Sequence, residues 1–270
     1  LALSLERDDS AFVGADACTG FRATGELGED FVRRLETLCL HWTDTPLIVR
    51  PSLPFGTPPS SSCHSIFCLN RGDTDTRVRE LIGAVRHIYQ DAAASPGDIP
   101  AALTIAPLHG RAHGTAFLPD LSGIALSCNP FAWSEYIDPK AGVARLVAGL
   151  GTRLARGSED FARTVALQAP ERRPEADFEE VRRGSQRRVD YLDLATGQLA
   201  TEYFMDMARQ LPGMAVSLLS TPDETPHPVT GESLPILTLE PIIGRGPFVR
   251  DLREIVRLLH EAFDYPVEIE

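Results

Sequence analysis

Lysine is almost absent from this sequence of 270 residues: of its 26 basic residues, only Lys140 is a lysine. Basic residues are also outnumbered, since 38 Asp and Glu residues give a formal net charge of −12. Proteins that bind nucleic acid through its phosphates carry surplus cations, so this charge argues against a nucleic-acid partner. Any phosphate must here be met mainly by arginine, whose planar guanidinium suits bidentate contacts.

Long apolar runs are absent too. No stretch of 18 apolar residues occurs in the sequence, so it predicts no transmembrane helix and we expect no membrane partner. Residues 1–7 have neither the basic start nor the apolar run of a signal peptide, and the first residue is not methionine. We therefore expect a fragment of a longer protein.

Cysteine is scarce and odd in number. The five cysteines are Cys18, Cys39, Cys63, Cys68 and Cys128. Their irregular spacing fits neither the disulfide framework of a small secreted domain nor a paired zinc signature. The pattern predicts reduced thiols and a cytoplasmic location.

Apolar residues recur at both helical and strand spacing. Spacing of three and four residues predicts amphipathic helices through Phe31–Leu38, Val78–Tyr89 and Val249–Phe263. Short apolar runs bounded by glycine, proline or polar residues predict strands at 46–50, 65–69, 102–106, 115–118, 123–127 and 267–270. Further apolar segments lie at 144–150, 164–167, 189–194 and 214–219. This mixture, without internal repeats, predicts the fold class α+β (mixed α/β).

Arg50 ends one of these apolar runs and precedes the loop 51–62, which is rich in proline and serine. An arginine at the end of a buried strand, facing a loop, is placed to hold a phosphate through two N–H donors. A salt bridge at the rim of the sheet is the alternative. We interpret the loop as functional rather than as a domain boundary.

Glu268 and Glu270 alternate with apolar residues at the end of the chain. A strand puts both carboxylates on one face, about 7 Å apart. Mg²⁺ prefers such oxygen ligands, so the pair is a candidate metal site. The alternative is an exposed edge strand protected by acidic residues.

Other motifs are weak. The turn at 149–153 lacks the full spacing of a dinucleotide fingerprint and the lysine of a P-loop. His109 and His113 flank glycine, so we interpret them as surface histidines in a turn rather than as metal ligands. Arginines and acidic residues are mixed at 171–188, which predicts a solvated helix surface.

Five segments, taken in order, resemble motifs of the nucleotide-binding domain of the phosphoenolpyruvate synthase and pyruvate phosphate dikinase family, an ATP-grasp fold. Residues 46–52 (P-L-I-V-R-P-S) look like that family's P-L-x-V-R-S-S. Residues 122–130 (S-G-I-A-L-S-C-N-P) are similar to S-G-V-A-F-S/T-x-N-P, and 149–151 match a G-L-G turn. Residues 189–194 (V-D-Y-L-D-L) resemble the V-D-V-L-D-L of a subgroup, and 266–270 (P-V-E-I-E) resemble P-V-D-I-E.

This resemblance implies one ATP-grasp-like domain over 1–270, with two interlocked lobes at roughly 1–100 and 101–270. It implies ATP and Mg²⁺ as cofactors. The family transfers the β-phosphoryl group of ATP, by way of a histidine domain, to pyruvate. The expected partners are therefore a nucleotide and, through another domain, pyruvate or another phosphate acceptor.

The same resemblance assigns roles to individual residues. Arg50 would be catalytic and would contact the ATP phosphates. Ser52, Gly149 and Gly151 would also bind ATP. Glu270, together with Glu268, would ligate Mg²⁺.

Departures from the family motifs motivate an alternative. Pro51 replaces a serine, no acidic pair follows it, and residues 61–63 (S-S-C) stand where the family has F-A-G. The family's G-G-K segment, with its lysine, and its Q-x-R would lie beyond the two ends of this sequence, so truncation and loss both remain open for them. The alternative is a catalytically degenerate domain that acts as a nucleotide sensor or as an assembly partner, in a homo-oligomer or with another chain. A third hypothesis is an unrelated binding domain with chance matches.

Overall fold

The computed structural model describes residues 11–13, 26–52, 65–94, 102–154, 162–211, 213–225, 231 and 233–270. These residues form a mixed α+β protein with seven α-helices and several small antiparallel sheets, which confirms the predicted class at that level. Contacts divide the chain into two compact units. Unit 1 comprises residues 1–109 and 192–199, and unit 2 comprises residues 110–191 and 200–270.

Unit 1 is built on an antiparallel sheet of four strands in the order β1-β4-β2-β3. The strands are β1 (Ala11–Val13), β2 (Leu47–Ser52), β3 (Ile66–Cys68) and β4 (Ala102–Pro107). Val49 on β2 lies opposite Ile66 on one side and Ile105 on the other. The β-branched residues of β2 suit this central position.

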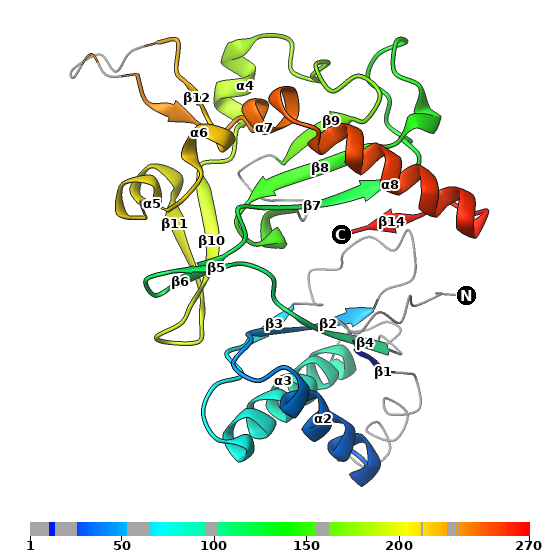
Figure 1. The fold of residues 1–270 in the computed structure, drawn as a ribbon, viewed down its shortest axis with the longest axis vertical. Helices are drawn as coiled ribbons and strands as arrows, with labels where there is room; N and C mark the ends of the chain where they lie inside the picture. The colour runs from blue at the N-terminus through cyan, green and yellow to red at the C-terminus, as the bar shows by residue number, and fades with distance from the viewer. Residues whose placement is uncertain are drawn as a thin grey trace. The chain divides into compact units, whose positions relative to one another are not determined.

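Two helices, α2 (Glu29–His41) and α3 (Thr74–Ala94), lie on one face of this sheet (Figure 1). One stripe of each helix and alternate residues of β2 and β4 supply the core: Leu35, Cys39, Val78, Leu81, Val85, Leu47, Val49, Leu103 and Ile105. The three-and-four spacing therefore predicted both helices correctly. Helix α3 is capped by Asp73, whose carboxylate accepts a hydrogen bond from the Thr76 N–H at 2.7 Å.

Unit 2 contains an antiparallel sheet in the order β14-β7-β8-β9. The strands are β7 (Leu121–Leu126), β8 (Val143–Ala148), β9 (Arg163–Ala166) and β14 (Glu268–Ile269). The third predicted helix, α8 (Phe248–Phe263), runs along one face of this sheet (Figure 1). It buries Val249 and Val256 against the sheet's core residues.

A second sheet has the order β11-β10-β6-β5. Its strands are β5 (Arg111–His113), β6 (Ala116–Leu118), β10 (Arg188–Asp193) and β11 (Leu199–Tyr203). The interpretation of 109–113 as a turn is wrong for Arg111–His113, which pairs with β6. Glycine is needed at position 110 because the backbone lies close to β6 there: an added Cβ would lie 2.8 Å from the carbonyl carbon of Leu118.

The remaining elements are short. They are η1 (Pro139–Ala141), η2 (Gly151–Leu154), α4 (Phe178–Gly184), α5 (Phe204–Gln210), α6 (Val216–Leu219), β12 (Thr221–Pro222), β13 (Pro235–Ile236) and α7 (Glu240–Arg245). The apolar segment at 214–219 thus forms a helix and no strand.

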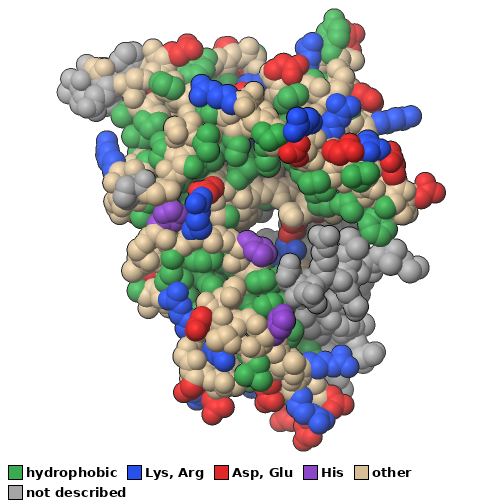
Figure 2. Space-filling model, viewed as in Figure 1, with side chains coloured by type: hydrophobic (Ala, Val, Ile, Leu, Met, Phe, Trp, Pro, Cys, Tyr) green, Lys and Arg blue, Asp and Glu red, His purple; other side chains and the backbone are tan. Residues whose placement is uncertain are grey.

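Basic and acidic side chains are interspersed on the face of the molecule that Figure 2 shows. Among the described helices, none combines the length and the apolar character needed to cross a bilayer. The predicted loop 51–62 begins later than expected, because Pro51 and Ser52 still belong to β2. Its residues 53–62 lie outside the described part of the chain.

Candidate functional site

Two motif segments of unit 2, far apart in sequence, are joined by reciprocal hydrogen bonds. The Ser127 N–H donates to the Val267 carbonyl at 2.9 Å, and the Val267 N–H donates to Ser127 Oγ at 2.9 Å. Beyond this link, Glu268 on β14 lies opposite Leu126 on β7. The S-G-I-A-L-S-C-N-P and P-V-E-I-E segments are therefore neighbouring strands.

The G-L-G turn joins two further motif segments. Ser122 Oγ donates to the Gly149 carbonyl at 2.7 Å, and the Leu150 N–H donates to the Asp190 carbonyl at 3.0 Å. Gly149 has φ of +76°, and an added Cβ would lie 2.4 Å from Cγ1 of Val189. Glycine is required here because the turn closely approaches β10 and adopts a left-handed conformation.

The side chain of Asp190 on β10 stabilises the segment that follows the G-L-G turn. Its carboxylate is buried, with the residue 6% exposed, and accepts hydrogen bonds from Thr152 Oγ1 at 2.7 Å and Thr201 Oγ1 at 2.6 Å. Arg153 donates from Nε at 3.0 Å and from Nη2 at 2.9 Å. Such charge-assisted bonds are stronger than neutral ones, so Asp190 fixes the residues that directly follow Gly151.

Gly151 differs from Gly149. In the described part of the chain, the atoms nearest an added Cβ are Leu154 Cδ1 at 3.4 Å and Ser122 Cβ at 3.6 Å, which are ordinary contacts. Gly151 is also exposed. Packing within the fold does not require glycine at this position. A missing side chain leaves the backbone open to close approach by a ligand.

The β14-β7-β8-β9 sheet has two different faces. Its apolar face packs into the core through residues such as Ala125, Ala144 and Ile269. The opposite face, here called the polar face because it holds Ser122, Arg145, Thr164 and Glu268, also carries Ile124, Leu126, Val143, Val147 and Ala166, of which the last three are buried. Glu270 follows Ile269, so the alternation of the pleat puts it on the polar face as well.

Glu268 and Glu270 are both exposed. Because β14 runs antiparallel to β7, Glu270 lies toward the end of the sheet that carries Ser122 and the G-L-G turn. Within the described residues, no three His, Cys, Asp or Glu side chains gather into a metal-binding cluster. Two carboxylates nevertheless suit Mg²⁺, which in nucleotide sites takes one or two carboxylates together with phosphate oxygens and water.

Arg50 and Ser52 belong to unit 1, whereas the other predicted site residues belong to unit 2. Arg50 is partly buried and lies opposite Thr104 on β4. Its neighbour Val49 points into the core beneath α2 and α3, so Arg50 lies on the other face of the sheet. The prediction that Arg50 ends its strand is wrong, since β2 continues to Ser52, which pairs with Ala102.

Arg145 is a candidate that sequence reasoning did not single out. It is the single charged residue of β8, a strand described in full, and it is partly buried. On the polar face it lies between Ile124 of β7 and Thr164 of β9. The signal that could have revealed it is an arginine inside the apolar run 143–148.

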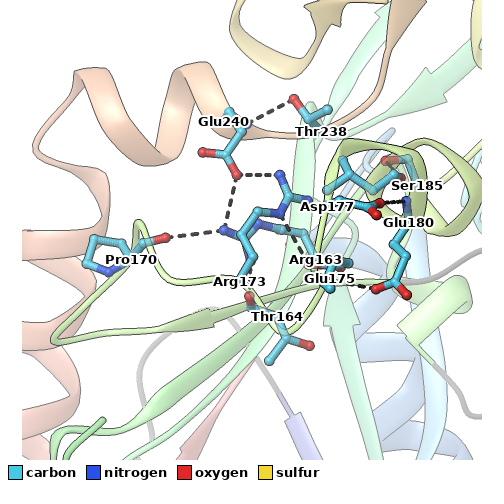
Figure 3. Close-up of polar contacts among 12 residues, drawn as sticks. Arg163, Thr164, Pro170, Arg173, Glu175, Asp177, Glu180, Ser185, Thr238 and Glu240 are labelled. Atoms are coloured by element: carbon cyan, nitrogen blue, oxygen red, sulfur yellow. Dashed lines mark hydrogen bonds and ion pairs between the residues drawn. The ribbon is translucent and has the colours of Figure 1, made fainter. Parts of the chain in front are cut away.

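Arg163 lies one strand away from Arg145 but on the apolar face, opposite Leu146. Its side chain is 4% exposed and donates from Nη2 to Glu240 Oε1 at 3.1 Å. Arg173 donates from Nη1 to the same oxygen at 2.7 Å (Figure 3). Burial, and then the charge of Arg173, lower the pKa of the Arg163 guanidinium. The network joins β9 to α7 and is structural.

The prediction of a solvated helix surface at 171–188 is wrong for Arg173. Arg173 precedes α4 in the chain. Its side chain is 18% exposed and pairs with both Glu175 and Glu240. Glu240 lies 67 residues further along the chain, so local charge spacing does not reveal this partner.

A hollow of about 720 Å³ lies beside this network. Its lining contains one arginine and six carboxylates: Arg173, Glu171, Glu175, Asp177, Asp223, Glu224 and Glu240. Like charges repel, so this lining disfavours a polyphosphate. This hollow therefore does not match the phosphate-binding site that the sequence predicts.

The cysteines of the described residues are free thiols. Cys39 and Cys68 are buried, and Cys128 is partly buried. Burial raises the pKa of the Cys39 and Cys68 thiols, which keeps them protonated and inert.

No protein-family model matches this chain, and no curated protein sequence matches it. The resemblance to the dikinase family therefore depends on the five motif segments themselves and stays a hypothesis.

Proposed function

We propose that this chain is the ATP-binding domain of a phosphotransferase similar to phosphoenolpyruvate synthase and pyruvate phosphate dikinase. The observation that carries this proposal is the convergence of segments 122–130, 149–151, 189–194 and 266–270. They are joined by Ser127–Val267, Ser122–Gly149 and Leu150–Asp190 contacts. These contacts link the four segments in series, although the segments are spread over 149 positions of the sequence.

The architecture also supports the proposal. Each unit combines helices with an antiparallel sheet, as expected of the two lobes of an ATP-grasp-like domain. Gly151 leaves an open stretch of backbone at the end of the unit 2 sheet, and two carboxylates lie on an edge strand of the same sheet. These groups suit a nucleotide and its metal ion.

Each residue has a stated task in this proposal. The Gly151 backbone would lie against the nucleotide, and Glu270 with Glu268 would hold Mg²⁺. The family resemblance gives Arg50 the task of contacting phosphate oxygens. Bound Mg²⁺ neutralises charge on the phosphates. Phosphoryl transfer depends mainly on aligning and neutralising the polyphosphate, so a domain without a covalent nucleophile suffices for the ATP half-reaction. The β-phosphoryl group would then pass to a histidine of another domain, with AMP as the leaving group, and water would take the γ-phosphoryl group, which is released as inorganic phosphate.

Calorimetric titration with MgATP tests the proposal. Wild-type protein should bind MgATP, and Arg50→Ala should weaken binding at least roughly tenfold, because a charged hydrogen bond is lost. Glu270→Gln should reduce the dependence of binding on Mg²⁺. Arg257→Gln is the matched control, since Arg257 pairs with Glu254 and Glu261 on the surface of α8. No MgATP binding by the wild type, or unchanged affinity in Arg50→Ala, contradicts the proposal.

A second candidate function is a nucleotide sensor that has lost catalysis. Pro51 favours it, because a proline replaces the first serine of the family motif within β2, directly after Arg50. This candidate predicts MgATP binding without cleavage of ATP. Formation of AMP and a phosphorylated histidine by the longer protein would exclude it.

A further inference from the structure

One buried carboxylate connects the segment after the G-L-G turn to the strands β10 and β11. Asp190 on β10 is 6% exposed, and its Oδ2 accepts a hydrogen bond from Thr152 Oγ1 at 2.7 Å. Its Oδ1 accepts from Thr201 Oγ1 of β11 at 2.6 Å and from Arg153 Nε at 3.0 Å. Thr152 and Arg153 directly follow Gly151. The carboxylate therefore holds η2 to this pair of strands.

The backbone of Asp190 holds the other side of the turn. Its carbonyl oxygen accepts a hydrogen bond from the Leu150 N–H at 3.0 Å and would lie 2.7 Å from a Cβ added to Gly149. Asp190 thus contacts the residues before Gly151 through its backbone and the residues after it through its side chain. Gly151 itself meets only ordinary contacts among the described residues. Its position is therefore set by its chain neighbours, and Asp190 fixes those neighbours on both sides.

This network is rigid because the charge at its centre is buried. The Asp190 and Arg153 side chains are 8% and 13% exposed. A buried carboxylate is stable only when it is paired and hydrogen-bonded, so each of its donors is held in a narrow range of positions. Charge-assisted hydrogen bonds are also shorter and stronger than neutral ones. A backbone that is already fixed in its binding position loses less freedom when a ligand binds, which raises the affinity.

We infer that Asp190 is a positioning residue for the nucleotide, which acts by holding the Gly151 backbone in place and makes no contact with the ligand. This inference rests on the proposed function and adds a supporting residue to it. Thr152 carries the effect, because its hydroxyl joins the carboxylate to the turn. Thr201 donates to the same carboxylate from β11, so it contributes to the stability of the strands and much less to the position of the turn.

Calorimetric titration with MgATP tests the inference on two threonines that donate to the same carboxylate. Thr152→Val should weaken MgATP binding roughly three- to tenfold, whereas Thr201→Val, which loses an equivalent hydrogen bond, should change it less than about twofold. Thr152→Ser keeps the hydroxyl and should bind like the wild type. Urea denaturation should show similar losses of stability for the two valine variants, because each removes one donor from the same buried carboxylate.

Two further variants separate positioning from loss of stability. Asp190→Asn removes the charge that holds Arg153 and should weaken MgATP binding more than Thr152→Val does. If Asp190→Asn does not fold, the threonine variants still decide. Glu240→Gln is the control, because it destabilises the same unit through the Arg163 ion pair and should leave MgATP affinity unchanged.

The outcomes are distinguishable. An Asp190 that only stabilises the fold would give the two valine variants equal MgATP affinities, and that result overturns the inference while the proposed function stands. A loss of affinity in Glu240→Gln as large as in Thr152→Val also overturns it, because lower stability alone would then explain the effect. If the wild type binds no MgATP, the proposed function and the inference fail together.

Discussion

Arg163 and Arg145 lie on adjacent strands of one sheet and on opposite faces of it. On the apolar face, Arg163 is 4% exposed at the side chain and its charge is met by Glu240. On the polar face, Arg145 is partly buried between Ile124 and Thr164. The comparison teaches that residue type does not decide a role. The face of the sheet decides which groups each arginine can reach, and only the apolar face brings Arg163 to Glu240 of α7.

The two glycines of the turn make the same distinction. Gly149 is explained by close packing against Val189 and Asp190, whereas Gly151 meets only ordinary contacts among the described residues. Substitution of Gly149 should therefore change the free energy of unfolding. Substitution of Gly151 should change ligand binding and leave stability unaltered.

Gly149→Ala should have the largest effect on stability. The backbone has φ of +76°, and the new methyl group would lie 2.4 Å from Val189 Cγ1 and 2.7 Å from the Asp190 carbonyl oxygen. Left-handed strain and overpacking together should cost roughly 2–5 kcal/mol, measured by urea denaturation. Gly151→Ala is the matched control and should stay within about 0.5 kcal/mol of wild type. Equal stability of the two variants would break the distinction.

Glu240→Gln should have the next largest effect. It removes the charge that Arg163 and Arg173 share, and Glu240 is 33% exposed, so solvent compensates only part of the loss. We expect about 2–3 kcal/mol of destabilisation by urea denaturation.

The control is Glu254→Gln on α8, where side chains of the Arg257–Glu254 pair are 47% and 55% exposed. A surface pair of this kind should contribute less than about 1 kcal/mol. If Glu240→Gln and Glu254→Gln were equally mild, the Arg163 network would not stabilise the apolar face as we describe.

Gly151→Ala should affect binding without affecting the fold. A methyl group on the exposed backbone of the turn would separate it from a nucleotide, so we expect MgATP affinity to fall roughly tenfold, or about 1.4 kcal/mol. Calorimetric titration measures this change, with the urea midpoint as the check on folding. Unchanged affinity would remove the turn from the proposed site.

Sequence patterns revealed what is local and periodic. The amphipathic stripes of α2, α3 and α8 predicted these helices, and the alternation of residues 267–270 predicted a strand, of which β14 (Glu268–Ile269) forms part. Long-range pairing was invisible. Neither the Glu240 partner of Arg173 nor the neighbours of Arg145 on β7 and β9 can be read without the strand register, because each depends on residues distant in the chain.

Asp73, an exposed carboxylate with an identified structural role, gives the smallest expected effect and a reference for Glu268 and Glu270. Hydrogen bonds from Thr76, first from its side chain and then from its backbone N–H, hold the pKa of Asp73 below its ordinary value. A lowered pKa means that the ionised form stabilises the fold above the unfolded pKa of about 3.9 and that this contribution is lost as the pH falls through the folded pKa.

Asp73→Asn keeps an acceptor oxygen at the start of α3 but cannot ionise. The wild type should therefore unfold at a slightly higher temperature than the variant near pH 6, and the gap should close as the pH falls through the lowered folded-state pKa of Asp73, because the wild-type carboxyl is then protonated too. Circular dichroism melts at several pH values measure the gap. A gap that is constant with pH would show that the charge of Asp73 is not what caps α3. Asp73 would then no longer serve as an example of an exposed carboxylate with a structural role, to be compared with the metal-binding role that we propose for Glu268 and Glu270.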